Sequence, residues 1–112
     1  MLQGFKVPKN NGKYYWTNHI VQKMVYYKIS PSRVKRIIRA PDRVEESIVP
    51  GLVAAMKKFS KSAKEEIWAI YQVDHKKLKL ISAWRYPGKS SERNPIPQEI
   101  LREIKLVINL GT

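Results

Sequence analysis

The sequence contains no cysteine, only two histidines and only nine acidic residues among its 112. Without cysteine the chain has no disulfide, no thiolate nucleophile and no thiolate metal ligand, which is typical of a reducing compartment. Two histidines far apart in the sequence do not predict a zinc site. The acidic pairs Glu45-Glu46 and Glu65-Glu66 point apart on strands, and we interpret them as solvated rather than as ligands of a catalytic metal. We therefore expect neither a metal ion nor another cofactor.

Long apolar runs are also missing. The longest, residues 48–56, is interrupted by Pro50 and Gly51, so the sequence predicts no transmembrane helix and no membrane partner. Residues 1–13 are polar and lack the apolar centre of a signal peptide, and we expect a cytoplasmic protein. The length and a hydrophobic content of 43% predict one folded domain over residues 1–112, with an irregular segment at residues 1–13.

Positive charge is the most pronounced feature that the sequence does have. Its 22 basic residues outnumber the nine acidic ones and give a net charge of +13. In residues 90–112 three basic side chains balance three acidic ones, so the whole excess belongs to residues 1–89. A field of one sign attracts phosphate backbones. The sequence therefore predicts a polyanion partner, RNA in the first place, and an electrically neutral C-terminal helix that packs or docks.

Apolar spacing predicts an α+β domain with two N-terminal helices, an antiparallel sheet of three or four strands, and a C-terminal helix. Thr17 and Ser30 are the expected N-caps of the first two helices, and Pro31 and Pro41 bracket the second. The first helix is expected at residues 18–28 and the last at residues 98–109. The expected strands are residues 43–49, 52–59, 66–73 and 78–86, with a further short strand at 13–16.

Several short motifs, taken in order, resemble a family of small bacterial toxins. His19-x-x-x-Lys23-Met24 is followed by Ile29-Ser30 between the two helices, by Pro41 after the second helix, and by Trp84-Arg85 in the last strand. With these motifs, residues 17–86 resemble domains with the RelE or BrnT type of fold. The resemblance implies a sheet flanked by helices, metal-independent cleavage of RNA, ribosome-bound message included, and pairing with an acidic antitoxin. Lys23, Tyr27 and Lys28 depart from the family pattern, in which Arg, Arg and Gly are common.

His19 is the candidate acid or base for such a reaction, because imidazole titrates near neutral pH. It falls in the first turn of the first helix, where the helix dipole lowers its pKa and favours the neutral form. Lys23 follows one turn later on the same helix face, so that a phosphate can bridge the two side chains. Arg85 is the third candidate catalytic residue, as a stabiliser of the transition state. The alternatives are local hydrogen bonds of His19 near the helix start, a solvated Lys23, and an ion pair between Arg85 and Glu66.

Further contacts with RNA are expected from basic and aromatic side chains. The basic residues of the second helix surround its apolar stripe. Lys57 and Lys58 point to opposite faces of a strand, so only one of them can reach a shared site, and we favour Lys58 as the RNA contact. Three tyrosines are candidates for contact with unpaired bases, whereas we assign Trp68 and Trp84 to the core. The expected RNA-binding residues are Tyr27, Arg33, Arg36, Arg39, Lys58, Tyr71 and Tyr86.

Three interpretations follow from these observations. The first is a toxin-like, metal-independent ribonuclease with His19, Lys23 and Arg85 in its active site. The second is a non-catalytic module that binds RNA or DNA through the basic side chains of the second helix. The third is a protein-interaction domain whose basic face meets an acidic antitoxin. The first interpretation requires the three candidate catalytic side chains to converge on one open cleft.

Overall fold

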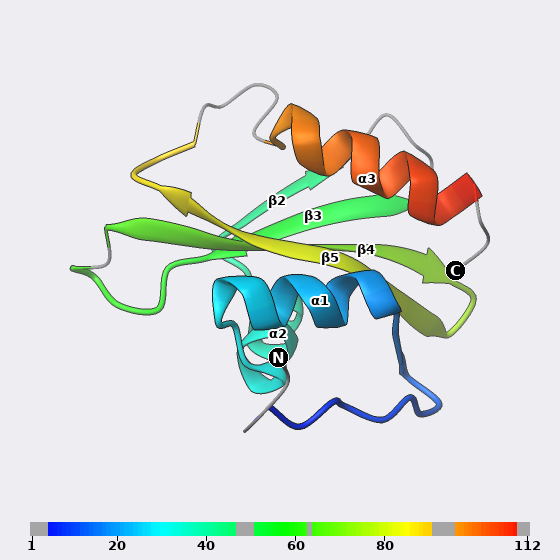
Figure 1. Cartoon of the computed structure of the whole chain (residues 1–112). Coiled ribbons are helices and arrows are strands. Elements are labelled where there is room, and N and C mark those ends of the chain that lie inside the picture. Colours follow the sequence, from blue (N-terminus) through cyan, green and yellow to red (C-terminus); the bar gives the residue numbers. More distant parts are fainter. Residues whose placement is uncertain (1–4, 47–50, 63, 91–95, 110–112) are drawn as a thin grey trace.

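Three helices pack against a five-stranded sheet in the computed structural model, which describes residues 5–46, 51–62, 64–90 and 96–109 (Figure 1). The elements are β1 (Tyr14–Trp16), α1 (Asn18–Tyr27), α2 (Pro31–Arg39), β2 (Arg43–Glu46), β3 (Leu52–Lys57), β4 (Glu65–Asp74), β5 (Lys77–Pro87) and α3 (Gln98–Asn109). The expected α+β class is confirmed. Residues 47–49, which the sequence assigns to a strand with residues 43–46, lie outside the described residues.

The sheet has the order β1-β5-β4-β3-β2, and strands β2 to β5 form the expected antiparallel meander. The first strand makes the sheet mixed, because β1 pairs with β5 in parallel, with Tyr14 opposite Leu78 and Trp16 opposite Leu80. The expectation of a purely antiparallel sheet of three or four strands is therefore corrected to five strands with one parallel pair. Helices α1 and α2 and strands β2, β3 and β4 lie between β1 and β5 in the sequence. No hairpin turn therefore dictates the relative direction of β1 and β5.

The helix ends fix how α1 and α2 lie on the sheet. Thr17 Oγ1 accepts a 3.2 Å hydrogen bond from the N–H of Ile20 and donates a 2.8 Å hydrogen bond to the carbonyl of Leu80. This joins the start of α1 to β5. Ser30 caps α2 as predicted. Between the helices Lys28 has a φ of 58°, the left-handed conformation in which helices commonly end.

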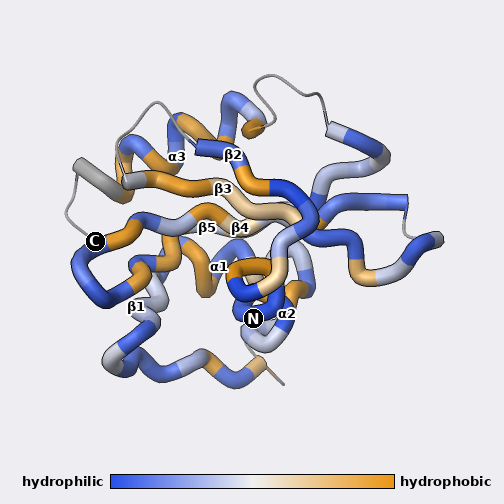
Figure 2. The backbone as a smooth tube through the Cα atoms, turned by 180° about the vertical axis from the view of Figure 1, so that it is seen from behind, coloured by the Kyte–Doolittle hydropathy of each residue, from blue (hydrophilic) through white to orange (hydrophobic). Residues whose placement is uncertain are grey.

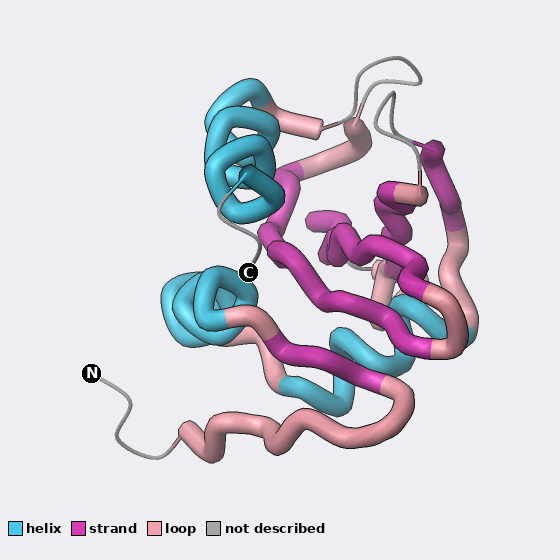
Figure 3. Tube along the Cα trace, turned by 90° about the vertical axis from the view of Figure 1, so that its right-hand side faces the viewer, coloured by secondary structure: helices cyan, strands magenta, loops and turns pink. Residues whose placement is uncertain are grey.

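Helices cover both faces of the sheet, with α1 and α2 on one side and α3 on the other (Figure 3). Under α1 and α2 the core contains buried side chains of both helices and of β1, β3, β4 and β5. On the other face Trp68 and Trp84 stack with ring centroids 5.8 Å apart, and α3 covers them with Ile100, Ile104 and Val107. The core assignment of both tryptophans is confirmed. Figure 2 shows the apolar stretches of the strands that lie between these helices.

Candidate nucleic-acid interface

His19 and Lys23 lie side by side on α1, and both contact a carboxylate of α3. His19 Nε2 is 3.3 Å from Glu103 Oε2, and Lys23 Nζ donates a 2.9 Å hydrogen bond to Glu103 Oε1. The side chains of His19 and Lys23 are only 16% and 20% exposed. The predicted proximity of the two is therefore present, but the anion between them belongs to the protein. Glu103 occupies the position that the sequence assigns to a phosphate.

The environment of His19 favours its neutral form. Burial of the imidazole lowers its pKa, and the nearby Lys23 charge lowers it further, while the Glu103 carboxylate acts in the opposite direction. The expected direction of the pKa shift is confirmed, and its main cause is burial instead of the helix dipole. Because Nε2 is buried and faces Glu103, the imidazole is not presented to an open cleft.

Arg85 lies at the other end of α1. Its Nε donates a 2.7 Å hydrogen bond to the carbonyl of Tyr27, and its Nη2 a 3.0 Å hydrogen bond to the carbonyl of Lys28. Tyr27 is eight residues after His19, which corresponds to about 12 Å of helix. The three candidate catalytic side chains therefore do not converge. The last carbonyls of a helix lack intrahelical partners and attract a cation, and the sequence pattern does not reveal this pairing.

The sequence interpretation of the acidic pair Glu65-Glu66 on β4 is corrected for both residues. Arg85 Nη1 pairs with Glu65 at 2.5 Å instead of with Glu66. Glu66 is only 1% exposed, so its interpretation as solvated is wrong. Burial alone acts to raise its pKa, but hydrogen bonds from Ser90 and Trp68 and the charge of Arg43 outweigh burial and lower it. Glu66 is buried because β4 is covered on both faces of the sheet.

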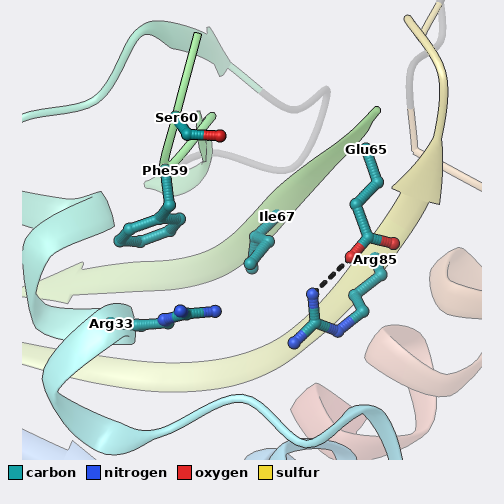
Figure 4. A pocket seen from close by; sticks show the side chains of 6 residues that line it. All are labelled: Arg33, Phe59, Ser60, Glu65, Ile67 and Arg85. Carbon is teal, nitrogen blue, oxygen red and sulfur yellow. Dashed lines mark hydrogen bonds and ion pairs between the residues drawn. The ribbon is translucent and has the colours of Figure 1, made fainter. Parts of the chain in front are cut away.

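A pocket of about 260 Å³ opens beside α2 and brings together residues from four parts of the chain (Figure 4). Arg33 comes from α2, Phe59 and Ser60 from the segment after β3, Glu65 and Ile67 from β4, and Arg85 from β5. Figure 4 shows Arg33 and Phe59 on one side, Glu65 and Arg85 on the other, and Ile67 between them. The volume of this pocket lies below the roughly 300–1,000 Å³ of pockets for drug-sized ligands.

The cations of this pocket differ in how tightly the protein holds them. The Arg85 guanidinium is fixed by two helix carbonyls and Glu65. The Arg33 guanidinium lies 5.0 Å from the centre of the Phe59 ring, and that of Arg36 lies 5.4 Å from it. Arg33 is exposed, and within the described part of the chain its guanidinium has no hydrogen bond or ion pair. It is therefore free to bind a ligand anion.

The pocket contains two of the predicted site residues, and two of its other four lining residues have side chains that matter for binding. Arg33 and Arg85 are the predicted members, and Arg36 lies against the same aromatic ring. Phe59 and Glu65 are the other two. An aromatic residue within a run of lysines was a usable signal for Phe59. No local signal marks Glu65, because its position in the pocket depends on the pairing of β4 with β5.

The other predicted RNA-binding residues are spread over the molecule. Arg39, the last residue of α2, and Lys58 are exposed, whereas Lys57 is held by the carbonyl of Ala40 at 2.8 Å. Three aromatic side chains do not share one surface: Tyr71 packs with the core under α1 and α2, Tyr86 with the core under α3, and Tyr27 with both. The predicted set of tyrosines therefore does not form a single stacking platform.

No three histidine, aspartate or glutamate side chains within the described ranges gather in a way that could hold a metal ion. No helix in the same ranges is long and apolar enough to cross a membrane. None of the family models, curated proteins and solved structures compared with this chain matches it.

Proposed function

We propose that this domain binds single-stranded RNA, and that the pocket beside α2 receives one unpaired base. The observation that carries this proposal is the Arg33 guanidinium, which lies against the Phe59 ring at the pocket and has no anionic partner among the described residues. Aromatic rings and guanidinium planes are the surfaces on which proteins stack unpaired bases. A guanidinium beside the ring can also bind the backbone phosphate next to the stacked base.

The surroundings of the pocket suit a phosphate backbone. Arg36 and Arg39 follow Arg33 on α2, and both are exposed. The segment that carries Phe59 is itself basic, with exposed side chains at Lys58, Lys61 and Lys64. These cations contribute to the excess of +13 in residues 1–89. Such a surface supplies sequence-independent, salt-dependent affinity, and the pocket adds contacts to a base.

A single strand fits these features better than a duplex. Bases of a duplex are stacked and paired, so their faces are not available to Phe59. An acidic partner protein would also bind the cations, but it would not require an aromatic ring in a pocket. RNA cleavage stays a prediction, because His19 and Lys23 face Glu103, and Arg85 binds the carbonyl of Tyr27, about 12 Å of helix beyond His19.

The test is fluorescence anisotropy with a labelled single strand of roughly 12 nucleotides, within the site sizes of single-strand binders, and with the matching duplex. Phe59→Leu keeps an apolar side chain but removes the aromatic face, and Tyr15→Leu is the matched control on β1. We expect Phe59→Leu to weaken binding of the single strand roughly tenfold, since stacking contributes about 1–3 kcal/mol per base. Tyr15→Leu should leave the affinity unchanged.

Two outcomes would contradict the proposal: equal affinity of wild type and Phe59→Leu for the single strand, or a preference for the duplex. A denaturing gel of the same samples tests cleavage. Loss of intact RNA with the wild type but not with His19→Ala would favour the ribonuclease interpretation over a binding module.

A further inference from the structure

Glu65 places a carboxylate inside a pocket whose other charged groups are guanidinium groups. Its side chain is 44% exposed, so the carboxylate is open to a ligand. A carboxylate repels phosphate and therefore weakens a site that binds only backbone. An ionised carboxylate accepts hydrogen bonds and donates none. Its presence in an RNA-binding pocket points to contact with hydrogen-bond donors of a base.

Arg85 holds this carboxylate in place. Two carbonyls at the end of α1 fix the guanidinium, which leaves Nη1 to bind Glu65 Oε1. Arg85 therefore orients the Glu65 carboxylate. The second oxygen, Oε2, has no hydrogen bond from the described residues. Oε1 also retains acceptor capacity, because each carboxylate oxygen accepts about two hydrogen bonds.

Guanine is the base whose edge matches this acceptor. Its Watson–Crick edge presents N1–H and the N2 amino group side by side, so one carboxylate can accept a hydrogen bond from each. Adenine and cytosine each present one amino group next to a ring acceptor, which the carboxylate would repel. Uracil presents one N–H between two carbonyl oxygens. A site of fixed acceptors rejects bases that lack the matching donors, because buried polar groups are then left unpaired.

The walls of the pocket allow stacking and edge contact together. Phe59 and Arg33 lie on one side, Glu65 and Arg85 on the other, and the buried Ile67 side chain between them (Figure 4). A base that rests against Phe59 and Arg33 has Glu65 in the same pocket. Resting on the proposed function, we infer that Glu65 makes the site selective for guanine in single-stranded RNA.

The experiment measures a ratio of affinities. Three labelled uridine-rich strands carry guanine, inosine or adenine at one central position, and dissociation constants are measured by anisotropy. We expect the wild type to bind the guanine strand about tenfold more tightly than the adenine strand, as for other bidentate base contacts. Inosine keeps N1–H but lacks the N2 amino group, so its strand should bind with intermediate affinity.

Glu65→Gln should reduce the ratio of guanine to adenine affinity to about one, because the amide replaces one acceptor oxygen with an NH2 donor that faces one of the two adjacent donors of guanine. Glu65→Asp keeps the charge with a shorter reach and should lower the ratio less. The control is Glu46→Gln on edge strand β2, which makes the same change in net charge and should keep the wild-type ratio. Circular dichroism of each variant verifies that it folds.

The outcomes separate the two proposals. Equal binding of all three strands by the wild type, or a preference for guanine that survives in Glu65→Gln, overturns guanine selectivity. If that binding still depends on Phe59, the proposed RNA-binding function stands without the selectivity. If the wild type binds none of the strands, the proposed function itself fails.

Discussion

Lys23 on α1 donates a 2.9 Å hydrogen bond to Glu103 on α3, although 80 positions separate the two residues. His19 lies 3.3 Å from the other oxygen of the same carboxylate. The contact joins helices whose apolar side chains pack on opposite faces of the sheet. The two side chains that the toxin resemblance assigns to catalysis are thus engaged in an interaction between helices.

Replacing the carboxylate should change the titration of His19. Glu103 acts to raise the His19 pKa, so we expect Glu103→Gln to lower that pKa further. The stability should fall by roughly 1 kcal/mol or less, because the pair is partly exposed. Glu99→Gln, an exposed carboxylate of the same helix, is the control. NMR titration of the imidazole protons gives the pKa, and a rise in Glu103→Gln would contradict the electrostatic role of Glu103.

The lowered pKa of His19 also makes the stability depend on pH. Between the ordinary value of 6.5 and the lower folded value, the unfolded chain binds more protons than the folded one. The free energy of unfolding should therefore be highest above about pH 6.5 and decrease as the pH falls towards the folded pKa. Urea unfolding across this range should show a shallower decrease for His19→Gln than for wild type. His75→Gln, in an exposed turn, should follow the wild type.

The sequence predicted where the helices and strands lie better than it predicted which of them pair or contact one another. Thr17 and Ser30 mark the helix starts correctly, because capping is a local interaction between neighbouring residues. The parallel pairing of β1 with β5 depends on residues more than 60 positions apart and has no local signal. For the same reason the sequence did not predict the hydrogen bonds of Arg85, because its three acceptors lie at the end of α1 and on β4.

The candidate site was predictable in its charge and not in its geometry. The basic character of α2 is visible in the sequence, and Arg33 does line the pocket. Glu65 and Glu66 are identical neighbours in the sequence, yet one opens into the pocket and the other is buried beside Trp68. The alternation of a strand separates the two side chains, but only the packing of both sheet faces decides what each one contacts.

Glu66 should be a major contributor to stability. Its Oε1 accepts hydrogen bonds from Trp68 Nε1 at 3.1 Å and from the N–H of Ser90 at 3.2 Å. Glu66→Ala leaves both donors buried without this acceptor, and we expect a loss of about 2–4 kcal/mol in urea unfolding at neutral pH. Glu66→Gln retains an acceptor oxygen and should lose less. Equal stability of wild type and Glu66→Ala would show that the buried carboxylate makes no net contribution.

The lowered pKa of Glu66 gives the same carboxylate an acid-dependent effect. The folded state holds its proton less tightly than the unfolded chain, so the stabilisation is complete above the ordinary value of 4.5 and is lost as the pH falls through the folded pKa. Below pH 4.5 the free energy of unfolding should therefore decrease less in Glu66→Gln than in wild type. Parallel curves for the two proteins would rule out this linkage.

The salt dependence of RNA binding should identify Arg33 as a phosphate contact. Each cation that neutralises a phosphate of a single strand contributes about 0.7 to the slope of log affinity against log salt concentration. Arg33→Gln should therefore reduce the magnitude of the slope by about 0.7. Lys77→Gln removes the same charge at the start of β5, far along the strand from Arg85, and should leave the slope unchanged. An equal reduction in both variants would mean that RNA is held by the overall positive charge and not by the pocket beside α2.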